Sequence, residues 1–515
     1  MARGSVLTWI PTALALASMS GAGCAGVETR GWFGSDPAKT RARNVILFVG
    51  DGMGISTVTA ARILEGQLRG ETGEENQLAF EALPHVALSK TYNTNQQVAD
   101  SAGTMTAMVA GEKTKAGILS LDDSVARGDW RGAAGAQLET LLEQAEDRGL
   151  STGVVTTARL THATPAACYA HTPERDWEND SLLPEAARAD DFPDIARQLV
   201  EFGHGDGLEV ALGGGRTHFL PATAPDPEDA GATGARADGR NLTAEWLERL
   251  PDSAYVWNAE QLAALDPAQT NHVLGLFEAS HMEYEFDRSG DAGGEPSLSE
   301  MTAFALKVLS RNPEGYFLMV EGGRIDHGHH ASNALRALTD AIEFSNAVRT
   351  ALEATSAEDT LVVVTADHSH VFTISGYPTR GNPILGLVRT NDQQGAPVAE
   401  PALDALGLPY TTLSYANGPG YTGASPAQKE GVKRFPHMVP EQEGITAGRP
   451  DLSSVDPSDP SYLQEAAVPL LSETHAGEDV AIYAGGPGAA AFDGVREQTY
   501  VYDGITRALG WSTAD

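Results

Sequence analysis

Runs of consecutive apolar residues that stop at a carboxylate recur along the chain. One run extends from Tyr316 to Val320 and ends at Glu321, and another, from Val45 to Val49, is followed by Gly50 and Asp51. A third run ends at Ala366, and Asp367 comes next. Unbroken apolar runs are typical of strands that are buried on both faces of a parallel sheet. Ligands of such sheets bind at the carboxyl ends of the strands. The pattern therefore predicts a functional site at that edge.

The segments between these runs predict helices and further strands. Residues from Ile55 to Leu68 and from about Ala334 to Ala354 have helical patterns, and a helix is expected to start near Ser101 and to end by Gly111. Additional strands are expected at Val154–Thr157 and Val480–Tyr483, whereas residues 190–310 have a helical and irregular character. The predicted fold class is α/β, with a large, mostly parallel central sheet and helices on both of its faces.

Changes in composition divide the chain into segments. Residues 1–24 contain an apolar stretch too short to span a membrane, and they resemble a signal peptide or a lipoprotein signal with Cys24 as the lipidated residue. Residues 25–40 have the composition of a polar tether. Residues 377–464 are rich in Gly, Pro, Asn and Ser, which indicates a loop-rich insertion into a catalytic α/β domain formed by 41–376 and 465–515. We expect an exported protein that is periplasmic, secreted or lipid-anchored.

The charge of the chain limits its partners. The formal net charge is -35, so nucleic acids and anionic lipid surfaces would be repelled. The chain has two cysteines, and one of them is Cys24, so no disulfide within the mature chain is expected. No transmembrane helix is expected.

The residues at the predicted strand ends are suited to binding metal ions. After Glu321 and two glycines, Asp326 and His330 follow at a spacing of four residues, which places them on one face if the chain is helical there. Ser101 stands among small residues at the predicted helix start, where the helix dipole favours a phosphate. An ordinary helix cap is the alternative for this serine. No Gly-x-Ser-x-Gly motif is present, so a nucleophilic Ser101 would be activated by a metal ion.

Taken together and in this order, five motifs resemble the signatures of the alkaline phosphatase family, in particular its animal-type branch. They are Asp51-Gly52-Met53-Gly54, Asp100-Ser101-Ala102-Gly103-Thr104, Glu321 to His330, Thr365 to His370 and Thr474 to Asp479. The resemblance extends from about Asn44 to Leu509. It implies hydrolysis of phosphate monoesters through a phosphoserine on Ser101, with release of inorganic phosphate and with Arg175 holding the phosphoryl oxygens.

The same resemblance implies a set of metal ligands. One zinc ion would be held by Asp326, His330 and His475. A second zinc ion would be held by Asp51, Asp367 and His368. One magnesium ion would be held by Asp51, Thr164 and Glu321, with His162 and His327 as nearby groups or alternative ligands. The residues that align with the ligands of a calcium-like ion in animal members are Glu228, Phe277, Glu278 and Glu295. The resemblance also implies a homodimer in which the 377–464 insertion forms the crown of the family.

Two other function classes remain as alternatives. The first is a phosphodiesterase or a sulfatase with the same fold. However, Asp100-Ser101-Ala102 lacks the modification motif of a sulfatase, and phosphodiesterases often lack an arginine such as Arg175. A non-catalytic metal- or phosphate-binding lipoprotein is the other. It would be expected to have lost Ser101 or a zinc ligand, and the sequence retains all of them.

Overall fold

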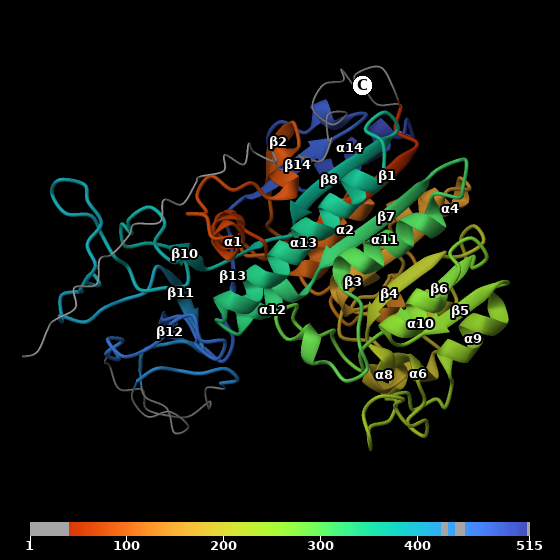
Figure 1. The fold of residues 1–515 in the computed structure, drawn as a ribbon. Coiled ribbons are helices and arrows are strands. Elements are labelled where there is room, and N and C mark those ends of the chain that lie inside the picture. The colour runs from red at the N-terminus through yellow and green to blue at the C-terminus, as the bar shows by residue number, and fades with distance from the viewer. Residues whose placement is uncertain (1–40, 424–430, 438–448, 512–515) are drawn as a thin grey trace, which may run out of the picture.

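A ten-stranded sheet forms the centre of the protein in the computed structural model, which describes residues 41–423, 431–437 and 449–511 (Figure 1). The spatial order of its strands is β15 (Gly494–Glu497), β2 (His85–Lys90), β14 (Val480–Gly485), β8 (Thr360–Ala366), β1 (Asn44–Gly50), β7 (Tyr316–Gly322), β3 (Ser151–Arg159), β4 (Val210–Gly214), β6 (His272–Leu276) and β5 (Ser253–Val256). β14 is antiparallel to both of its neighbours, and the other pairs are parallel. The predicted α/β class with a mostly parallel sheet is confirmed.

The position of β1 at the middle of the sheet brings the acidic strand ends together. β1 pairs with β7 on one side and with β8 on the other, and Gly50 is in register with Gly322 and Ala366. All residues of these three strands are buried, as their unbroken apolar runs predicted. Consequently Asp51, Glu321 and Asp367 lie at the same edge of the sheet, where the chain reverses its strand order and ligands bind in open α/β sheets.

Helices cover both faces of the sheet because alternate strand residues point to opposite sides. Ile46 and Phe48 pack with α1 (Ile55–Leu68), α11 (Leu298–Leu309) and α13 (Ala334–Ala354), and α11 and α13 lie across the sheet in the foreground of Figure 1. Val45 and Leu47 pack on the other face with α2 (Ser101–Ala110), α4 (Leu141–Asp147), α7 (Ile195–Val200), α9 (Leu242–Arg249) and α14 (Tyr500–Ala508). The bounds of α1 and α13 coincide with those predicted.

Residues 190–310 contain three strands of the sheet, β4, β5 and β6, so the expectation of helical and irregular structure was wrong there. These strands are short, and β4 ends in Gly213 and Gly214, which weakens its strand pattern. The glycines serve close packing: a Cβ at Gly213 would lie 2.7 Å from the Thr156 side chain, and one at Gly214 would lie 2.2 Å from the Ser280 carbonyl oxygen.

A second, smaller unit adjoins the main sheet. β10 (Phe372–Ile374), β11 (Leu413–Gly418) and β12 (Ala466–Pro469) form a three-stranded sheet, so the two strands that flank residues 377–464 both pair with a strand inside them. Apart from β11, the described residues of 377–464 form turns, bends and isolated bridges. The predicted signal and tether, with Cys24, lie outside the described residues. Within the described part of the chain, we find no helix that is long and apolar enough to cross a membrane.

Candidate active site and metal centres

Asp51 stands at the centre of the carboxylate edge. Its side chain is fully buried, and neither carboxylate oxygen has a hydrogen-bond partner. Burial raises the pKa of Asp51 well above its usual range, and the neighbouring charges of Asp367, Asp326 and Glu321 raise it further. Such a crowd of buried acidic groups is unfavourable unless a cation balances it. Asp51 belongs to two groups of side chains whose oxygen and nitrogen atoms are close enough to share an ion.

The first candidate metal group includes Asp326 and His330 of α12 (Arg324–His330) and His475, which follows the insertion. Asp326 Oδ1 lies 3.3 Å from Nε2 of both His330 and His475, and these two nitrogens are 3.1 Å apart. Their other ring nitrogens face backbone carbonyl oxygens: His475 Nδ1 lies 2.7 Å from that of Ala99, and His330 Nδ1 lies near that of Glu473. These contacts leave the Nε2 atoms available, as is usual for metal-binding histidines.

His370 also joins this first group, although no role was predicted for it from the sequence. Its Nε2 lies 2.8 Å from Asp326 Oδ1, and its Nδ1 contacts Glu473. Burial works to lower the pKa of His370, but Glu473 and Asp326 outweigh it and raise the pKa to about 10. The signal was present in Asp367-His368-Ser369-His370, whose second histidine lies two residues after the first and so points to the same side of an extended chain.

The second candidate group consists of Asp51, Asp367 and His368, and it adjoins Ser101. His368 Nε2 lies 3.4 Å from Asp51 Oδ1, 3.2 Å from Asp367 Oδ2 and 3.2 Å from Ser101 Oγ. Asp367 Oδ1 accepts hydrogen bonds from the backbone N–H groups of Gly52 and His368. Burial lowers the pKa of His368 well below its usual value, so this imidazole is neutral and can be a metal ligand.

The third candidate group surrounds the end of β7. Oxygen atoms of Asp51 and Glu321 lie close to a nitrogen of His162, and the Thr164 hydroxyl is buried nearby on α5 (Ala163–Ala166) without a hydrogen-bond partner. Glu321 Oε2 accepts a hydrogen bond from Thr156, while Oε1 is unpartnered. Burial raises the pKa of Glu321 to about 7, against the opposing effect of Thr156. The role of Thr156 was not foreseen from the sequence.

Ser101 is the first residue of α2, at the amino end of the helix. Asp100 caps the helix by accepting a hydrogen bond from the Gly103 N–H, and its other oxygen accepts one from Arg175 Nη1 at 3.2 Å. Arg175 Nη2 donates to His162 Nε2 at 3.1 Å. The structure thus brings the serine, the arginine and the second and third groups into one site, as the sequence analysis expected.

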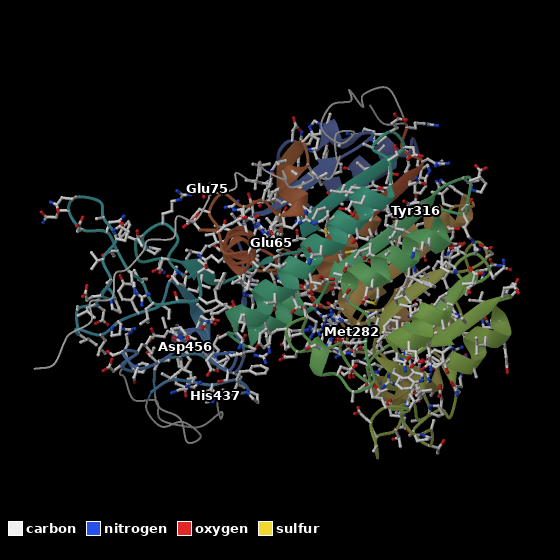
Figure 2. The ribbon with its side chains drawn as sticks, viewed as in Figure 1. Glu65, Glu75, Met282, Tyr316, His437 and Asp456 are labelled. Atoms are coloured by element: carbon white, nitrogen blue, oxygen red, sulfur yellow. The ribbon has the colours of Figure 1, made fainter. Side chains whose placement is uncertain are left out.

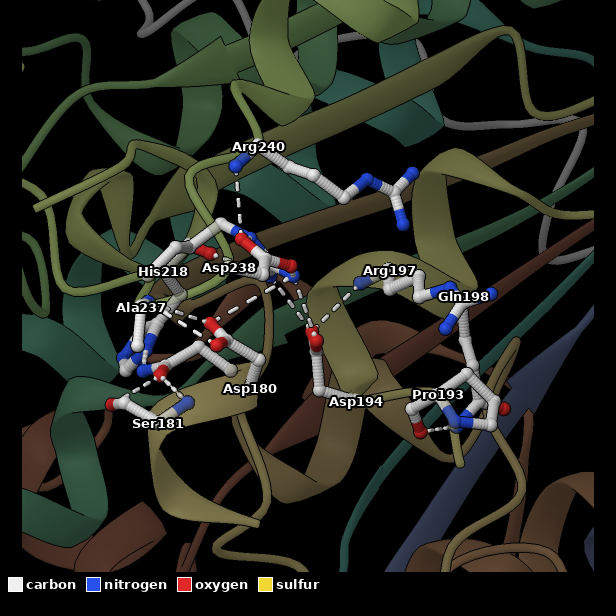
Figure 3. Close-up of polar contacts among 12 residues, drawn as sticks. Asp180, Ser181, Pro193, Asp194, Arg197, Gln198, His218, Ala237, Asp238 and Arg240 are labelled. Atoms are coloured by element: carbon white, nitrogen blue, oxygen red, sulfur yellow. Dashed lines mark hydrogen bonds and ion pairs between the residues drawn. The ribbon is translucent and has the colours of Figure 1, made fainter. Parts of the chain in front are cut away.

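A buried polar network lies a few residues after Arg175 in the chain. Arg236, whose side chain is fully buried, pairs with Asp194 at 2.9 Å, and the next residue, Ala237, donates its N–H to Asp180 (Figure 3). Asn179 Nδ2 contacts His218 in the same network. The network therefore anchors Asn179 and Asp180, which lie four and five residues after Arg175.

The predicted calcium ligands are only partly brought together. Glu228 and Glu278 form a group with Asp291, whereas Glu295 is not a member of that group and accepts the Glu283 N–H. Glu228 Oε2 also pairs with Arg216 at 2.8 Å. Burial raises the pKa of Glu278 to about 8 and that of Glu295 to about 9. Phe277 precedes Glu278 and has a buried side chain, so only its backbone carbonyl is available to an ion.

Comparisons with known proteins agree with one another. The alkaline phosphatase family model matches residues 42–511. An alkaline phosphatase of Gadus morhua is 45% identical over 468 residues, which are 90% of this chain and 91% of that protein. The tissue-nonspecific isozyme of Gallus gallus is 46% identical over 89% of this chain and 83% of its own. The crystal structure of Thermus thermophilus alkaline phosphatase has a TM-score of 0.63 at 24% identity, covering 95% of this chain and 94% of that one.

Proposed function

The chain belongs to the alkaline phosphatase family of phosphate-monoester hydrolases, and from this premise we propose how its own residues carry out the reaction. Ser101 is the nucleophile. The observation that most supports this role is its position at the amino end of α2, 3.2 Å from His368 and next to the Asp100–Arg175 pair. A phosphate placed there meets a helix N-terminus and a guanidinium group, which both favour its charge.

The reaction has two steps at Ser101. The Oγ atom attacks the phosphorus, the bond between phosphorus and the ester oxygen breaks, and the alcohol leaves with a proton. Water then attacks the phosphoserine and releases inorganic phosphate, which regenerates the hydroxyl. Arg175, fixed by Asp100 and His162, holds two non-bridging oxygens in both steps.

The donor sets fit three metal ions. Asp326, His330 and His475 offer the nitrogen and oxygen ligands that suit zinc, and so do Asp51, Asp367 and His368. The third group offers oxygen ligands, which suit magnesium, from Asp51, Thr164 and Glu321. Each of these side chains has a buried oxygen without a hydrogen-bond partner, and a bound ion would coordinate these oxygens. When bound, such ions lower the pKa of a nearby hydroxyl or water and stabilise charge on the phosphoryl oxygens.

One assay separates this proposal from a phosphodiesterase, a sulfatase and a non-catalytic binding protein. The full chain would be given a chromogenic phosphate monoester, the matching diester and the matching sulfate, each with and without a chelator. We expect rapid release from the monoester only, and loss of that activity with the chelator. Faster turnover of the diester or the sulfate would contradict the proposal, as would binding of the monoester without turnover.

Magnesium should activate the enzyme through Thr164. We expect added magnesium to raise the activity of metal-stripped enzyme that has been reloaded with zinc, and Thr164→Ala to blunt that gain. The hydroxyl is a neutral oxygen ligand of the third group, and alanine leaves that position empty. Activity measured against magnesium concentration checks this. Thr164→Ser, which keeps the hydroxyl, is the matched control. If magnesium does not change the activity of the zinc-loaded wild type, Asp51, Thr164 and Glu321 do not form a magnesium site.

We further propose a calcium-like ion bound by Glu228, Glu278 and the Phe277 carbonyl, with Asp291 as an additional ligand and Glu295 as a neighbouring carboxylate. The clustering of three partly buried carboxylates supports this site. Residues 41–376 and 465–515 form the catalytic domain in this proposal. Residues 377–464 form a crown-like insertion over the site that contributes to a homodimer.

The location of the protein is also part of the proposal. We propose that residues 1–24 direct export, that 25–40 act as a tether, and that the mature enzyme is periplasmic, secreted or lipid-anchored through Cys24. Mass spectrometry of the mature amino terminus tests the anchor, since an unmodified first residue would exclude it.

A further inference from the structure

Three histidine rings from three separate parts of the chain meet beside the third metal group. They are His162, which follows β3, His327 on α12, and His281, which follows β6. The ring centre of His281 lies 4.1 Å from that of His327 and 5.3 Å from that of His162, and His162 and His327 are 5.6 Å apart. His281 was not singled out in the sequence, although it follows the predicted calcium ligand Glu278 by three residues, because it belongs to none of the five family motifs.

Each of the three rings contacts a different arginine. Arg175 donates to His162 Nε2 at 3.1 Å, Arg324 donates to His327 Nδ1 at 3.1 Å, and Arg159 contacts His281. An arginine can only donate, so the nitrogen that receives it carries no proton. In His162 the proton of the neutral ring is therefore on Nδ1, which is buried and has no hydrogen-bond partner.

The backbone around His281 is firmly held at the strand ends. The N–H of the next residue, Met282, donates to the Thr157 carbonyl at 3.1 Å, and the Ser280 carbonyl accepts the Gly215 N–H at 2.6 Å. In Figure 2, Tyr316 marks the amino end of β7 and Met282 lies toward the other end, on the side of the site. A ring on so rigid a support can fix the rings that it touches.

His162 is the group on which the metal preference of the third position depends. One nitrogen of His162 lies within 4.8 Å of oxygens of Asp51 and Glu321. However, Nε2 of His162 accepts a hydrogen bond from Arg175. The rings of His281 and His327 also pack edge-on against the His162 ring, with angles between the ring planes of 79° and 64°. Imidazole ligands favour zinc, whereas oxygen ligands favour magnesium. A His162 that is free to turn would add nitrogen to an oxygen-lined position.

We propose that His281 is a positioning residue that keeps His162 from binding the ion of the third group, so that this position selects magnesium over zinc. The inference rests on the proposed function for the existence of the third metal position. His281 does not touch the reacting atoms. Its effect comes from the ring that packs against His162 and His327.

The test measures bound metal rather than turnover. Metal-stripped full-length wild type, His281→Ala and His281→Asn would be dialysed against the same buffered mixture of zinc and magnesium, and the ions per chain would be determined by mass spectrometry. We expect the ratio of zinc to magnesium at the third position to rise about 10-fold in both variants, a change of the size that removal of a group orienting a metal ligand has on metal affinity. Zinc at the other two positions should be unchanged.

Two further variants complete the design. His281→Phe keeps an aromatic ring at this place and should retain the wild-type ratio, and His204→Ala removes a partly exposed histidine far from the site as a matched control. An unchanged ratio in His281→Ala and His281→Asn would overturn the proposal. An equal shift in His281→Phe would also overturn it, because the ring would then not be the determinant. The measurement does not depend on catalysis, so a failure of monoester hydrolysis would be recognised separately.

Discussion

Replacing Ser101 with alanine should lower the turnover of a phosphate monoester by about 10³-fold or more, as is typical when a nucleophile is removed. The serine is 3% exposed, and its hydroxyl is the group at the amino end of α2 that can reach a phosphate beside Asp51, Asp367 and His368. No metal ligand is changed, so the zinc content should remain that of the wild type. Steady-state kinetics and metal analysis of the purified variant check both parts.

The control for this variant is Ser124→Ala, which removes an exposed hydroxyl from a loop and should leave kcat unchanged. A second check uses a radiolabelled or mass-tagged phosphate ester. The wild type, stopped with acid, should carry phosphate on the peptide that contains Ser101, and the Ser101→Ala variant should carry none. Near-normal activity in Ser101→Ala would remove this residue as the nucleophile.

Replacing Asp51 with asparagine should have an effect of similar size, through the metal ions. Asp51 is shared by the second and third candidate groups, and an amide of the same shape removes its charge from both. Losing several kcal/mol of transition-state stabilisation corresponds to a fall in kcat of about 10³-fold or more. Metal analysis should show loss of magnesium and of one of two zinc ions, whereas the group around Asp326 keeps its ion.

The same variant should change stability in opposite directions with and without metal. A carboxyl group whose pKa is raised by folding destabilises the folded protein at every pH above its unfolded value. The pKa of Asp51 is raised by burial and by Asp367, Asp326 and Glu321. At pH 8 with a chelator, Asp51→Asn should therefore have a higher Tm than the wild type, and with zinc and magnesium a lower one.

Asp191→Asn is the matched control, since Asp191 has an 82% exposed side chain and a positive φ that asparagine accepts readily. It should match the wild type in kcat, metal content and Tm. A zinc content of Asp51→Asn equal to that of the wild type would contradict the assignment of Asp51 as a shared ligand.

The sequence by itself determined the fold class and the family, and it predicted residues of the site that the structure brings close together. The strands next to Asp51, Glu321 and Asp367 could be predicted because strands buried on both faces require unbroken apolar runs, and this requirement is local. The helix Ala334–Ala354 was predicted from its amphipathic pattern, and the helix Ile55–Leu68 from its position after the Gly-rich turn at Asp51. The motif order identified the family, and the family matches and close relatives confirm it.

Other features were decided only by the tertiary structure. β4, β5 and β6 are too short for a clear pattern, and they become strands because their neighbours in the sheet supply the hydrogen bonds. The contacts of His370 with Asp326, of Thr156 with Glu321 and of His281 with His327 join residues far apart in the chain. Sequence patterns report on neighbours along the chain, whereas these contacts depend on how β3, β6 and α12 are placed in space.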